Sequence, residues 1–294
     1  SALLHGLDQA VTTACVDDEV RVVVVVANGD DFCGGFDITD NTSSLGEGAT
    51  WDERRSNTHE EIELWMKILN ARKPFIAALK GWVIGGGYAL ALTCDCLVAA
   101  ENTIMDNTEF AAGMSYVSYT PLEAWKMPMN IAKEKLFTGY SITAEEGYRI
   151  GLINHVVPLE EVDDCAFALA KRMLKLSPYT LAMHKAFVNM AYDLQGMKHI
   201  IPFAEEAFSI SRTLPGTKEN QEIWEYGKTH TGEELIQMTE QYPEKYEAYM
   251  HLALSYNAQG KKTTAKQYYD KAKKYYEENG TQDSVMEELK DVLG

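Results

Sequence analysis

The chain has few basic residues and no long hydrophobic run. Its 27 Lys and Arg residues are outnumbered by 44 Asp and Glu residues among 294, which gives a formal net charge of −17. Because proteins bind nucleic acid by neutralising its phosphates, this balance argues against a nucleic-acid partner. The longest apolar run, residues 20–27, is far shorter than the roughly 20 residues that a membrane helix needs. It favours a buried strand instead, and we expect no membrane association.

Cysteine is scarce, and its pattern predicts neither a disulfide framework nor a metal site. Five cysteines in a long chain fit a reducing compartment. The chain opens without the basic, apolar and small-residue sections of a secretory signal, so we expect a cytoplasmic location. Cys94 and Cys96 have no second Cys or His pair at zinc-like spacing, so we expect two small buried residues on one strand and no metal.

The first 228 residues alternate between helix and strand patterns. Strands in this part are apolar on both faces, and amphipathic or helix-forming segments separate them. Such a pattern indicates an α/β fold with a mostly parallel sheet covered by helices. The segments that carry it are expected helices at 2–15, 58–70, 130–137, 143–150 and 160–175, with more helix out to about 228, and expected strands at 20–27, 74–79 and 95–100.

One long segment between the first strand and the next helix is polar and rich in turn residues. Residues 40–57 read as a loop, and a loop beside a ligand site is a natural lid. We therefore predict a lid there. His59 follows it, and we interpret this residue as an exposed helix-start residue rather than a base.

We expect residues 229–294 to form a second domain, because their composition differs and they contain no strand-like run. Tyr249, Leu252, Ala253 and Tyr256, followed by Gly260, Ala265, Tyr269 and Ala272, follow the spacing of a tetratricopeptide repeat. One such repeat cannot bury its own apolar face. We expect this all-α segment to pack on the first domain, on a second subunit or on a partner. A generic helical hairpin is the alternative.

Three consecutive glycines, Gly85, Gly86 and Gly87, lie between two apolar runs. A strand that ends here and leads into a helix at 88–93 places free backbone N–H groups at a helix N-terminus, where they favour negative charge. A phosphate cradle is excluded, because neither phosphate-binding glycine pattern can be read here. One half of an oxyanion hole remains, and a tight strand-to-helix packing turn is the alternative.

A second glycine turn follows the first expected strand. Residues 32–37 (FCGGFD) and 81–87 (GWVIGGG) together resemble the two signature turns of the enoyl-CoA hydratase/isomerase family, the crotonases. Residues 94–101, 137–146 and 151–158 are similar to later segments of that family, in the same order. The resemblance covers residues 1–228 and implies a crotonase-like ββα-superhelix core. The C-terminal segment does not belong to it.

The resemblance implies an acyl-CoA substrate and no cofactor beyond coenzyme A. The family holds the thioester oxygen with two backbone amides, which here match Phe36 and Gly86. Gly35 and Asp37, with Gly85 and Gly87, then complete the two substrate-binding turns. A thioester that becomes an enolate puts a full charge on its oxygen. Amides fixed in advance stabilise that charge by roughly 3–4 kcal/mol per donor.

The acid–base equipment departs from the family. Hydratases of the family use two carboxylates, but the first matching position here is Ala89, which cannot move a proton. The second is Glu109, whose apolar neighbours would raise its pKa towards neutrality and suit it to general acid–base work. An ordinary helix N-terminal Glu is the alternative. Tyr116 and Tyr119 lie where the family has a Pro/Gly-rich turn, and they contact either the acyl group or the protein's own packing.

These features lead to an enoyl-CoA isomerase or a hydratase/lyase as the expected enzyme. One carboxylate is enough for a double-bond shift, while Trp82 and the missing acid resemble the hydroxycinnamoyl-CoA hydratase-lyase branch. A decarboxylase or hydrolase of the same family, and a non-catalytic acyl-CoA-binding or assembly module, stay open. By resemblance we expect a homo-oligomer (trimer or hexamer), with a possible protein partner at the C-terminal helices. In the family, a strand pair and an adenine-contacting loop precede the helix that we expect at 2–15; truncation or unresolved residues would account for their absence from this sequence.

Overall fold

The computed structural model describes residues 2–35, 50–107 and 120–211, together with residues 266–267, 269–270 and 273–274. The chain divides into two compact units, residues 1–216 and 217–294. The short described pieces of the second unit are helical, and the expected tetratricopeptide pattern lies otherwise outside the described residues.

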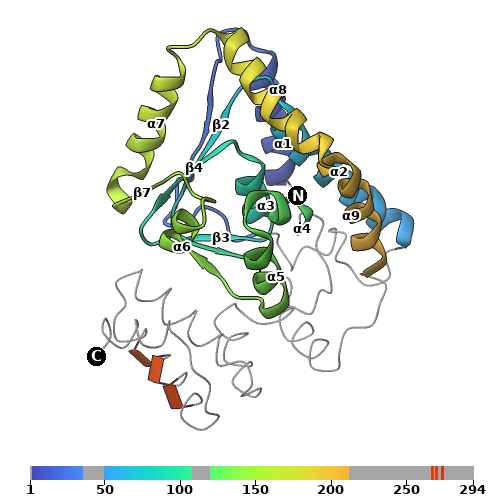
Figure 1. Ribbon diagram of the computed structural model, residues 1–294, viewed down its shortest axis with the longest axis vertical. Coiled ribbons are helices and arrows are strands. Elements are labelled where there is room, and N and C mark those ends of the chain that lie inside the picture. Colours follow the sequence, from blue (N-terminus) through green and yellow to red (C-terminus); the bar gives the residue numbers. More distant parts are fainter. Residues whose placement is uncertain are drawn as a thin grey trace. The chain divides into compact units, whose positions relative to one another are not determined.

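The first unit alternates helices and strands along the chain, as its sequence predicts (Figure 1). Its elements are α1 (Ala2–Val16), β1 (Val23–Val25), α2 (Trp51–Asn70), β2 (Phe75–Leu79), β3 (Trp82–Ile84), α3 (Gly86–Thr93), β4 (Cys96–Ala100), β5 (Ile104–Asp106), α4 (Thr120–Lys126), α5 (Met129–Thr138), β6 (Ile142–Thr143), α6 (Ala144–Arg149), β7 (His155–Val157), the 3-10 helix η1 (Leu159–Glu161), α7 (Val162–Met173), α8 (Pro178–Leu194) and α9 (Met197–Ser211).

The described strands form two sheets. The larger has the order β1-β2-β4-β7 and is parallel throughout, which confirms the expected mostly parallel sheet. The smaller has the order β3-β5-β6, with β3 parallel to β5 and β6 antiparallel to β5. The sequence did not predict this second sheet as a unit, because its strands are two or three residues long. It nevertheless carries the glycine turn at the end of β3.

The larger sheet is covered on both faces, which explains its continuous apolar strands. Along β2, alternate residues enter two different cores. Phe75, Ala77 and Leu79 join a cluster with side chains of α2 and α3, whereas Ile76 and Ala78 pack with side chains of α7. Figure 1 shows the same division, with α7 on one side of the sheet and α2, α8 and α9 on the other. Gly86 and Gly87, the first residues of α3, are buried as well.

The start of α2 corrects the end of the expected loop at 40–57, whose residues 40–49 lie outside the described residues. This helix begins at Trp51, because Thr50 and Glu53 form a capping box: the Glu53 N–H donates to Thr50 Oγ1 (3.3 Å) and the Thr50 N–H donates to Glu53 Oε2 (2.8 Å). The T-x-x-E signal was present and was missed. His59 consequently lies inside α2 rather than at its start. It is half-exposed, and its Nδ1 lies 3.2 Å from Glu205 Oε2 on α9.

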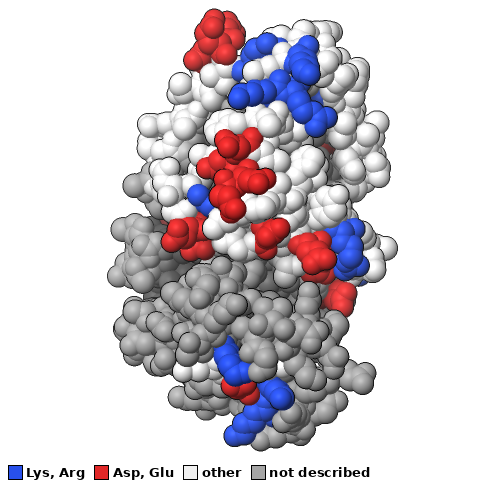
Figure 2. All heavy atoms as spheres, turned by 90° about the vertical axis from the view of Figure 1, so that its left-hand side faces the viewer, with Lys and Arg blue, Asp and Glu red and all other residues white. Residues whose placement is uncertain are grey.

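Charge on the face covered by α7 is sorted along that helix. Its first turn is acidic, with Asp163 and Asp164, and its last turn is basic, with Lys171 and Arg172. Both ends complement the helix dipole. Figure 2 shows acidic and basic side chains gathered in separate areas of this face.

Within the described ranges, no helix combines the length and apolarity required to cross a bilayer.

Candidate active site

The first glycine turn is held beside β3 by backbone hydrogen bonds. The Phe32 N–H donates to the Lys80 carbonyl (2.8 Å), the Cys33 N–H donates to the Trp82 carbonyl (3.0 Å), and the Ile84 N–H donates to the Cys33 carbonyl (2.9 Å). Cys33 thereby forms a parallel bridge with β3. The turn that follows the first strand is thus paired with the strand that leads into the glycine triplet.

Gly81 makes this pairing possible. Its φ is +51°, and a Cβ at this position would lie 2.1 Å from Asp31 Oδ1 and 2.8 Å from the Asp30 carbonyl oxygen. Asp31 Oδ1 accepts a hydrogen bond from the Trp82 N–H (2.8 Å). Only glycine therefore lets the backbone at 81 come this close to the first turn.

The second glycine turn starts α3 without any side-chain cap. Gly85 is the N-cap residue, with φ 52° and ψ −115°. Its N–H donates to the Asp106 carbonyl (3.2 Å), and its carbonyl accepts the Ala89 N–H (2.9 Å). Gly86 is the first helical residue. The first N–H groups of a helix have no partner within it and carry partial positive charge, so the amide at Gly86 suits a developing anion.

The two turns touch each other at this helix start. A Cβ on Gly87 would lie 2.4 Å from the Cβ of Cys33, and a Cβ on Gly35 would lie 3.2 Å from the Ile84 carbonyl oxygen. Gly35 has φ +89°, which also favours glycine. The structure thus brings together Gly35, Gly85, Gly86 and Gly87. The other predicted site residues, Phe36, Asp37, Glu109, Tyr116 and Tyr119, lie outside the described residues.

Ala89, where the family carries its first acid, is fully buried in α3. Every residue of this helix is buried, so its start is a dry environment in which dipoles act strongly. Asp106, at the end of β5, is also buried, and its Oδ2 accepts a hydrogen bond from Ser141 Oγ (2.7 Å).

Sequence reasoning missed a buried charged pair behind the glycine turn. Glu123 of α4 and Lys135 of α5 are 0% and 1% exposed, and Lys135 Nζ lies 3.6 Å from Glu123 Oε1. Lys135 Nζ also lies 5.0 Å from the ring centroid of Tyr88, in the first turn of α3. Burial raises the pKa of Glu123, while Lys135 opposes that shift. Only the helical spacing of Lys135 with buried Ala132 could have signalled its burial.

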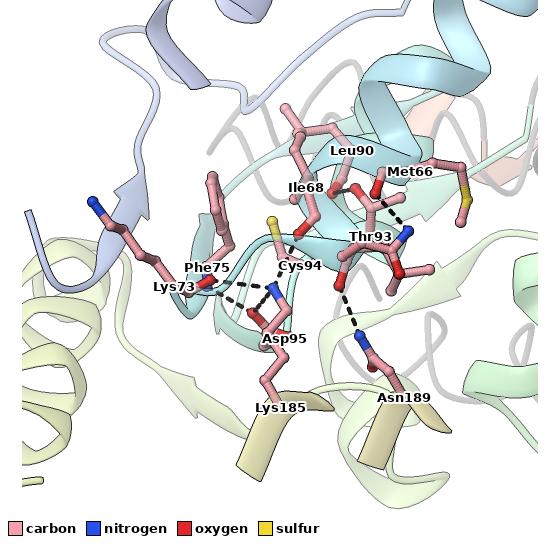
Figure 3. A network of polar contacts seen from close by, with 12 residues as sticks. Met66, Ile68, Lys73, Phe75, Leu90, Thr93, Cys94, Asp95, Lys185 and Asn189 are labelled. Carbon is pink, nitrogen blue, oxygen red and sulfur yellow. Dashed lines mark hydrogen bonds and ion pairs between the residues drawn. The ribbon is translucent and has the colours of Figure 1, made fainter. Parts of the chain in front are cut away.

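The C-terminal end of α3 carries a second polar network (Figure 3). Lys185 of α8 reaches the residues that follow the helix, and its Nζ donates to Asp95 Oδ2 (2.8 Å), to the Ile68 carbonyl (3.0 Å) and to the Lys73 carbonyl (3.2 Å). Asp95 Oδ2 also accepts the Phe75 N–H (2.7 Å). This network joins α8, the end of α2 and the start of β2.

Cys94 and Cys96 flank Asp95, which belongs to that network. Cys94 is the buried C-cap residue of α3, and only Cys96 belongs to β4, which corrects the expectation that both lie on one strand. Burial, followed by the neighbouring Asp95, raises the pKa of Cys94 to about 12. Across the described parts of the chain, no cluster of three His, Cys, Asp or Glu side chains is arranged to hold a metal ion.

Comparisons with known proteins agree with this geometry. A family model described as "Enoyl-CoA hydratase/isomerase" matches residues 1–210. The chain is 30% identical over 193 residues to "Probable enoyl-CoA hydratase, mitochondrial" of Dictyostelium discoideum, covering 65% of this chain and 67% of that protein. It is 29% identical over 195 residues to "2,3-dehydroadipyl-CoA hydratase" of Escherichia coli, covering 66% and 74%.

Solved structures show the same fold. A probable enoyl-CoA hydratase from Mycobacterium smegmatis superimposes with a TM-score of 0.66 at 31% identity, over 71% of this chain and 83% of that one. The matched share leaves the C-terminal part of this chain without a counterpart in the family model, which ends at residue 210.

Proposed function

The chain belongs to the enoyl-CoA hydratase/isomerase family, and on that premise we propose that it stabilises the enolate of an acyl-CoA thioester between two backbone amides, those of Gly86 and Phe36. The observation that supports this proposal is the contact between the two glycine turns at the start of α3, where Gly87 meets Cys33. Phe36 directly follows Gly35, which lies in that contact. Two preorganised donors at one carbonyl oxygen lower the barrier to enolate formation.

Glu109 is the proposed proton-transfer group. The fully buried Ala89 has no proton to move, which favours chemistry that needs a single carboxylate. In a double-bond isomerisation, the carboxylate removes a proton from C2 of a 3-enoyl thioester and returns it to C4. The double bond moves from C3–C4 to C2–C3, and the thioester oxygen carries the negative charge in between. Glu109 ends the cycle as it began, so no further acid is required.

Hydration or retro-aldol cleavage is the second candidate for the same site. The names of the Dictyostelium and E. coli relatives, both hydratases, favour it. Glu109 would then activate water, and Tyr116 and Tyr119 would contact the acyl group. A decarboxylase or hydrolase of the family would use the same amide pair, since each passes through a charged thioester oxygen.

A panel of thioesters separates these reactions. Wild-type protein is assayed with 3-enoyl-, 2-enoyl-, 3-hydroxyacyl- and malonyl-type CoA esters. Products are separated by chromatography against standards, because isomers have equal mass, and are then identified by mass. Conversion of the 3-enoyl ester alone supports the isomerase, and gain of water by the 2-enoyl ester supports the hydratase. A protein that binds CoA esters but converts none is the non-catalytic acyl-CoA-binding module.

Substitution of Glu109 tests its role. Glu109→Gln keeps the shape of the side chain and removes its basicity, so kcat should fall by about 10²- to 10⁴-fold with little change in KM. Glu101→Gln is the matched control, because Glu101 is an exposed carboxylate in the turn after β4. Turnover that survives in Glu109→Gln would remove Glu109 from the mechanism.

The assembly state is part of the proposal. Exposed apolar side chains on α8 and α9 favour a homo-oligomer, among them Tyr179, Phe187, Met190, Leu194 and Phe203. The molecular mass of the full chain and of residues 1–230 in solution tests this expectation and asks whether residues 229–294 control assembly. An unchanged oligomer would leave a protein partner as the proposed use of the C-terminal segment. The cytoplasmic location stays a prediction.

A further inference from the structure

Behind the glycine turn, three buried polar side chains from three helices meet. Tyr88 and Glu123 are fully buried, and Lys135 is 1% exposed. Lys135 Nζ lies 3.6 Å from Glu123 Oε1 and 5.0 Å from the centre of the Tyr88 ring. The three residues, hereafter the Tyr88 cluster, connect α3, α4 and α5.

Tyr88 is the polar link between α3 and its neighbours. It lies two residues after Gly86, in the first turn of the helix. Gly85 offers no side-chain cap, and the other polar side chain of α3, Thr93, donates to the Leu90 carbonyl within the helix itself (2.8 Å). The contact of Tyr88 with Lys135 therefore links the first turn of α3 to α5.

Asp106 connects the same cluster to the glycine turn from the other side. Its carbonyl accepts a hydrogen bond from the Gly85 N–H (3.2 Å). Its carboxylate accepts a hydrogen bond from Ser141, and its charge contributes to the raised pKa values of Tyr88 and Glu123. The N-terminus of α3 is thus enclosed between the Asp106 backbone and the Tyr88 cluster. A shift of the cluster would move the first turn of α3, and with it the amide of Gly86.

The ion pair in this cluster is a poor source of stability. At 3.6 Å it is longer than a hydrogen bond, and neither the Glu123 carboxylate oxygens nor Lys135 Nζ have a hydrogen-bond partner within the described residues. Desolvating two charges costs more than such a contact returns, and apolar residues of similar size at a buried pair are often neutral or stabilising. A reason other than stability is therefore needed for these charges at this place.

We infer that Glu123, Lys135 and Tyr88 are positioning residues for the amide of Gly86, and that they set how strongly the glycine turn polarises a thioester carbonyl. Lys135 lies over the face of the Tyr88 ring, and Glu123 lies beside its ammonium group. The inference rests on the proposed function, because it concerns the same amide. In this proposal none of the three residues contacts the substrate, and each acts through the backbone of α3.

Titration in the cluster is consistent with mutual dependence. Burial, and then the neighbouring Glu123 carboxylate, raises the pKa of Tyr88 far above its usual value, so the phenol stays neutral. Burial raises the pKa of Glu123, and the Lys135 ammonium is the main group that opposes the shift. Removing the Lys135 ammonium should therefore raise the pKa of Glu123 further.

The test removes both charges together. Glu123→Met with Lys135→Met replaces the pair with apolar side chains of similar size, and Tyr88→Phe removes one oxygen. The first readout is kcat and KM. The second is the absorption of bound 2,4-hexadienoyl-CoA, which moves to longer wavelength when hydrogen-bond donors polarise its conjugated carbonyl. We expect the double variant to lower kcat by about tenfold, to change KM by less than about threefold and to reduce the wavelength shift.

Lys185→Met is the matched control, since Lys185 is a buried, carboxylate-paired lysine over an aromatic ring at the other end of α3. It should lower the melting temperature and leave the wavelength shift unchanged. A folded double variant with the wild-type kcat and wavelength shift overturns the inference. If the double variant does not fold, a wild-type wavelength shift and kcat in Tyr88→Phe overturn it. Absence of both turnover and wavelength shift in the wild-type protein counts against the proposed function instead.

Discussion

The two ends of α3 each hold a buried lysine, and the two lysines differ in how well they are satisfied. Lys185, near the C-terminal end, pairs with Asp95 at 2.8 Å and donates to two backbone carbonyls. Lys135, near the N-terminal end, has one carboxylate at 3.6 Å and no hydrogen bond within the described residues. Each also lies over an aromatic ring, that of Phe75 or of Tyr88. The two lysines are therefore alike in residue type and burial, and they differ in the hydrogen-bond acceptors that their ammonium groups reach.

That difference separates a structural role from a positioning role. A lysine whose three hydrogens are all used ties elements together, and its loss leaves several buried acceptors unpaired. A lysine held loosely beside a functional helix start contributes little to stability, and its charge acts instead on neighbouring groups. Substitutions at both ends of α3 test whether the two lysines have these different roles.

The largest effect is expected at Lys185. Lys185→Met leaves Asp95 without its cation and uncaps the end of α2, so the free energy of unfolding should fall by about 3–5 kcal/mol. Urea unfolding measures it. Lys171→Met, at an exposed position in the last turn of α7, is the control and should change the stability by less than about 0.5 kcal/mol.

The double substitution of Glu123 and Lys135 with Met measures how much the ion pair at the other end of α3 contributes to stability. In the same urea experiment, its free energy of unfolding should stay within about 1 kcal/mol of wild type. A loss as large as that in Lys185→Met would show that structural ion pairs hold both ends of α3. The proposed difference in role between Lys135 and Lys185 would then be wrong.

Gly87→Ala should have an intermediate effect on stability and a large one on activity. The new methyl would lie 2.4 Å from Cys33 Cβ and 3.1 Å from its carbonyl oxygen, so the two turns must separate. We expect a loss of about 1–3 kcal/mol in unfolding free energy and loss of the hexadienoyl-CoA wavelength shift. Gly34→Ala is the control, because a Cβ there meets nothing within 4 Å. Adding Cys33→Gly to Gly87→Ala should recover part of the loss, and its failure to do so would assign the clash elsewhere.

A smaller effect concerns pH. The pKa of Glu123 is raised in the folded state, so folded protein binds its proton more tightly than unfolded protein. The resulting stability is fully present below the unfolded pKa near 4.5 and is lost as the pH rises through the folded pKa. Wild type should therefore lose stability relative to Glu123→Gln over that rise. Urea unfolding of both proteins at stepped pH values measures it, and parallel curves would contradict the prediction.

The smallest effect is expected at Cys94. Its pKa of about 12 leaves almost no thiolate at pH 8, and the side chain is buried at the C-terminal end of α3. Iodoacetamide should leave Cys94 unmodified in folded protein and modify it after denaturation, as read by peptide mass spectrometry. Modification of folded protein at Cys94 would mean that this end of the helix opens.

The strands and most helices were predictable because their patterns are local. The β-branched run at 20–27 and the apolar segment at 74–79 each carry their own signal, and the structure has strands there at Val23–Val25 and Phe75–Leu79. The capping box at Thr50 was equally local and was overlooked, which misplaced the start of α2. The smaller sheet was not predicted as a unit, since strands of two or three residues have no period to detect.

Some features of the candidate site were also predictable from the sequence, and others were not. The strand-to-helix turn at Gly85 was predictable from residue type, because its φ of 52° favours glycine. The role of the Gly86 amide stays a prediction. The burial of Glu123 and Lys135 was not, since charged residues on short helices usually face solvent and only the packing of α3, α4 and α5 against each other reverses that. The predictions for Phe36, Glu109, Tyr116 and Tyr119 stay predictions.

The bridge between Cys33 and β3 also has a consequence for folding kinetics. The bridge joins segments that α2 and β2 separate in sequence, so it forms only after a large loop has closed. The paired turns should then form after the local turns of the helices that lie between them in sequence. Recovery of acyl-CoA binding would consequently lag behind recovery of helical signal, and a fragment lacking either segment would have no such site at all.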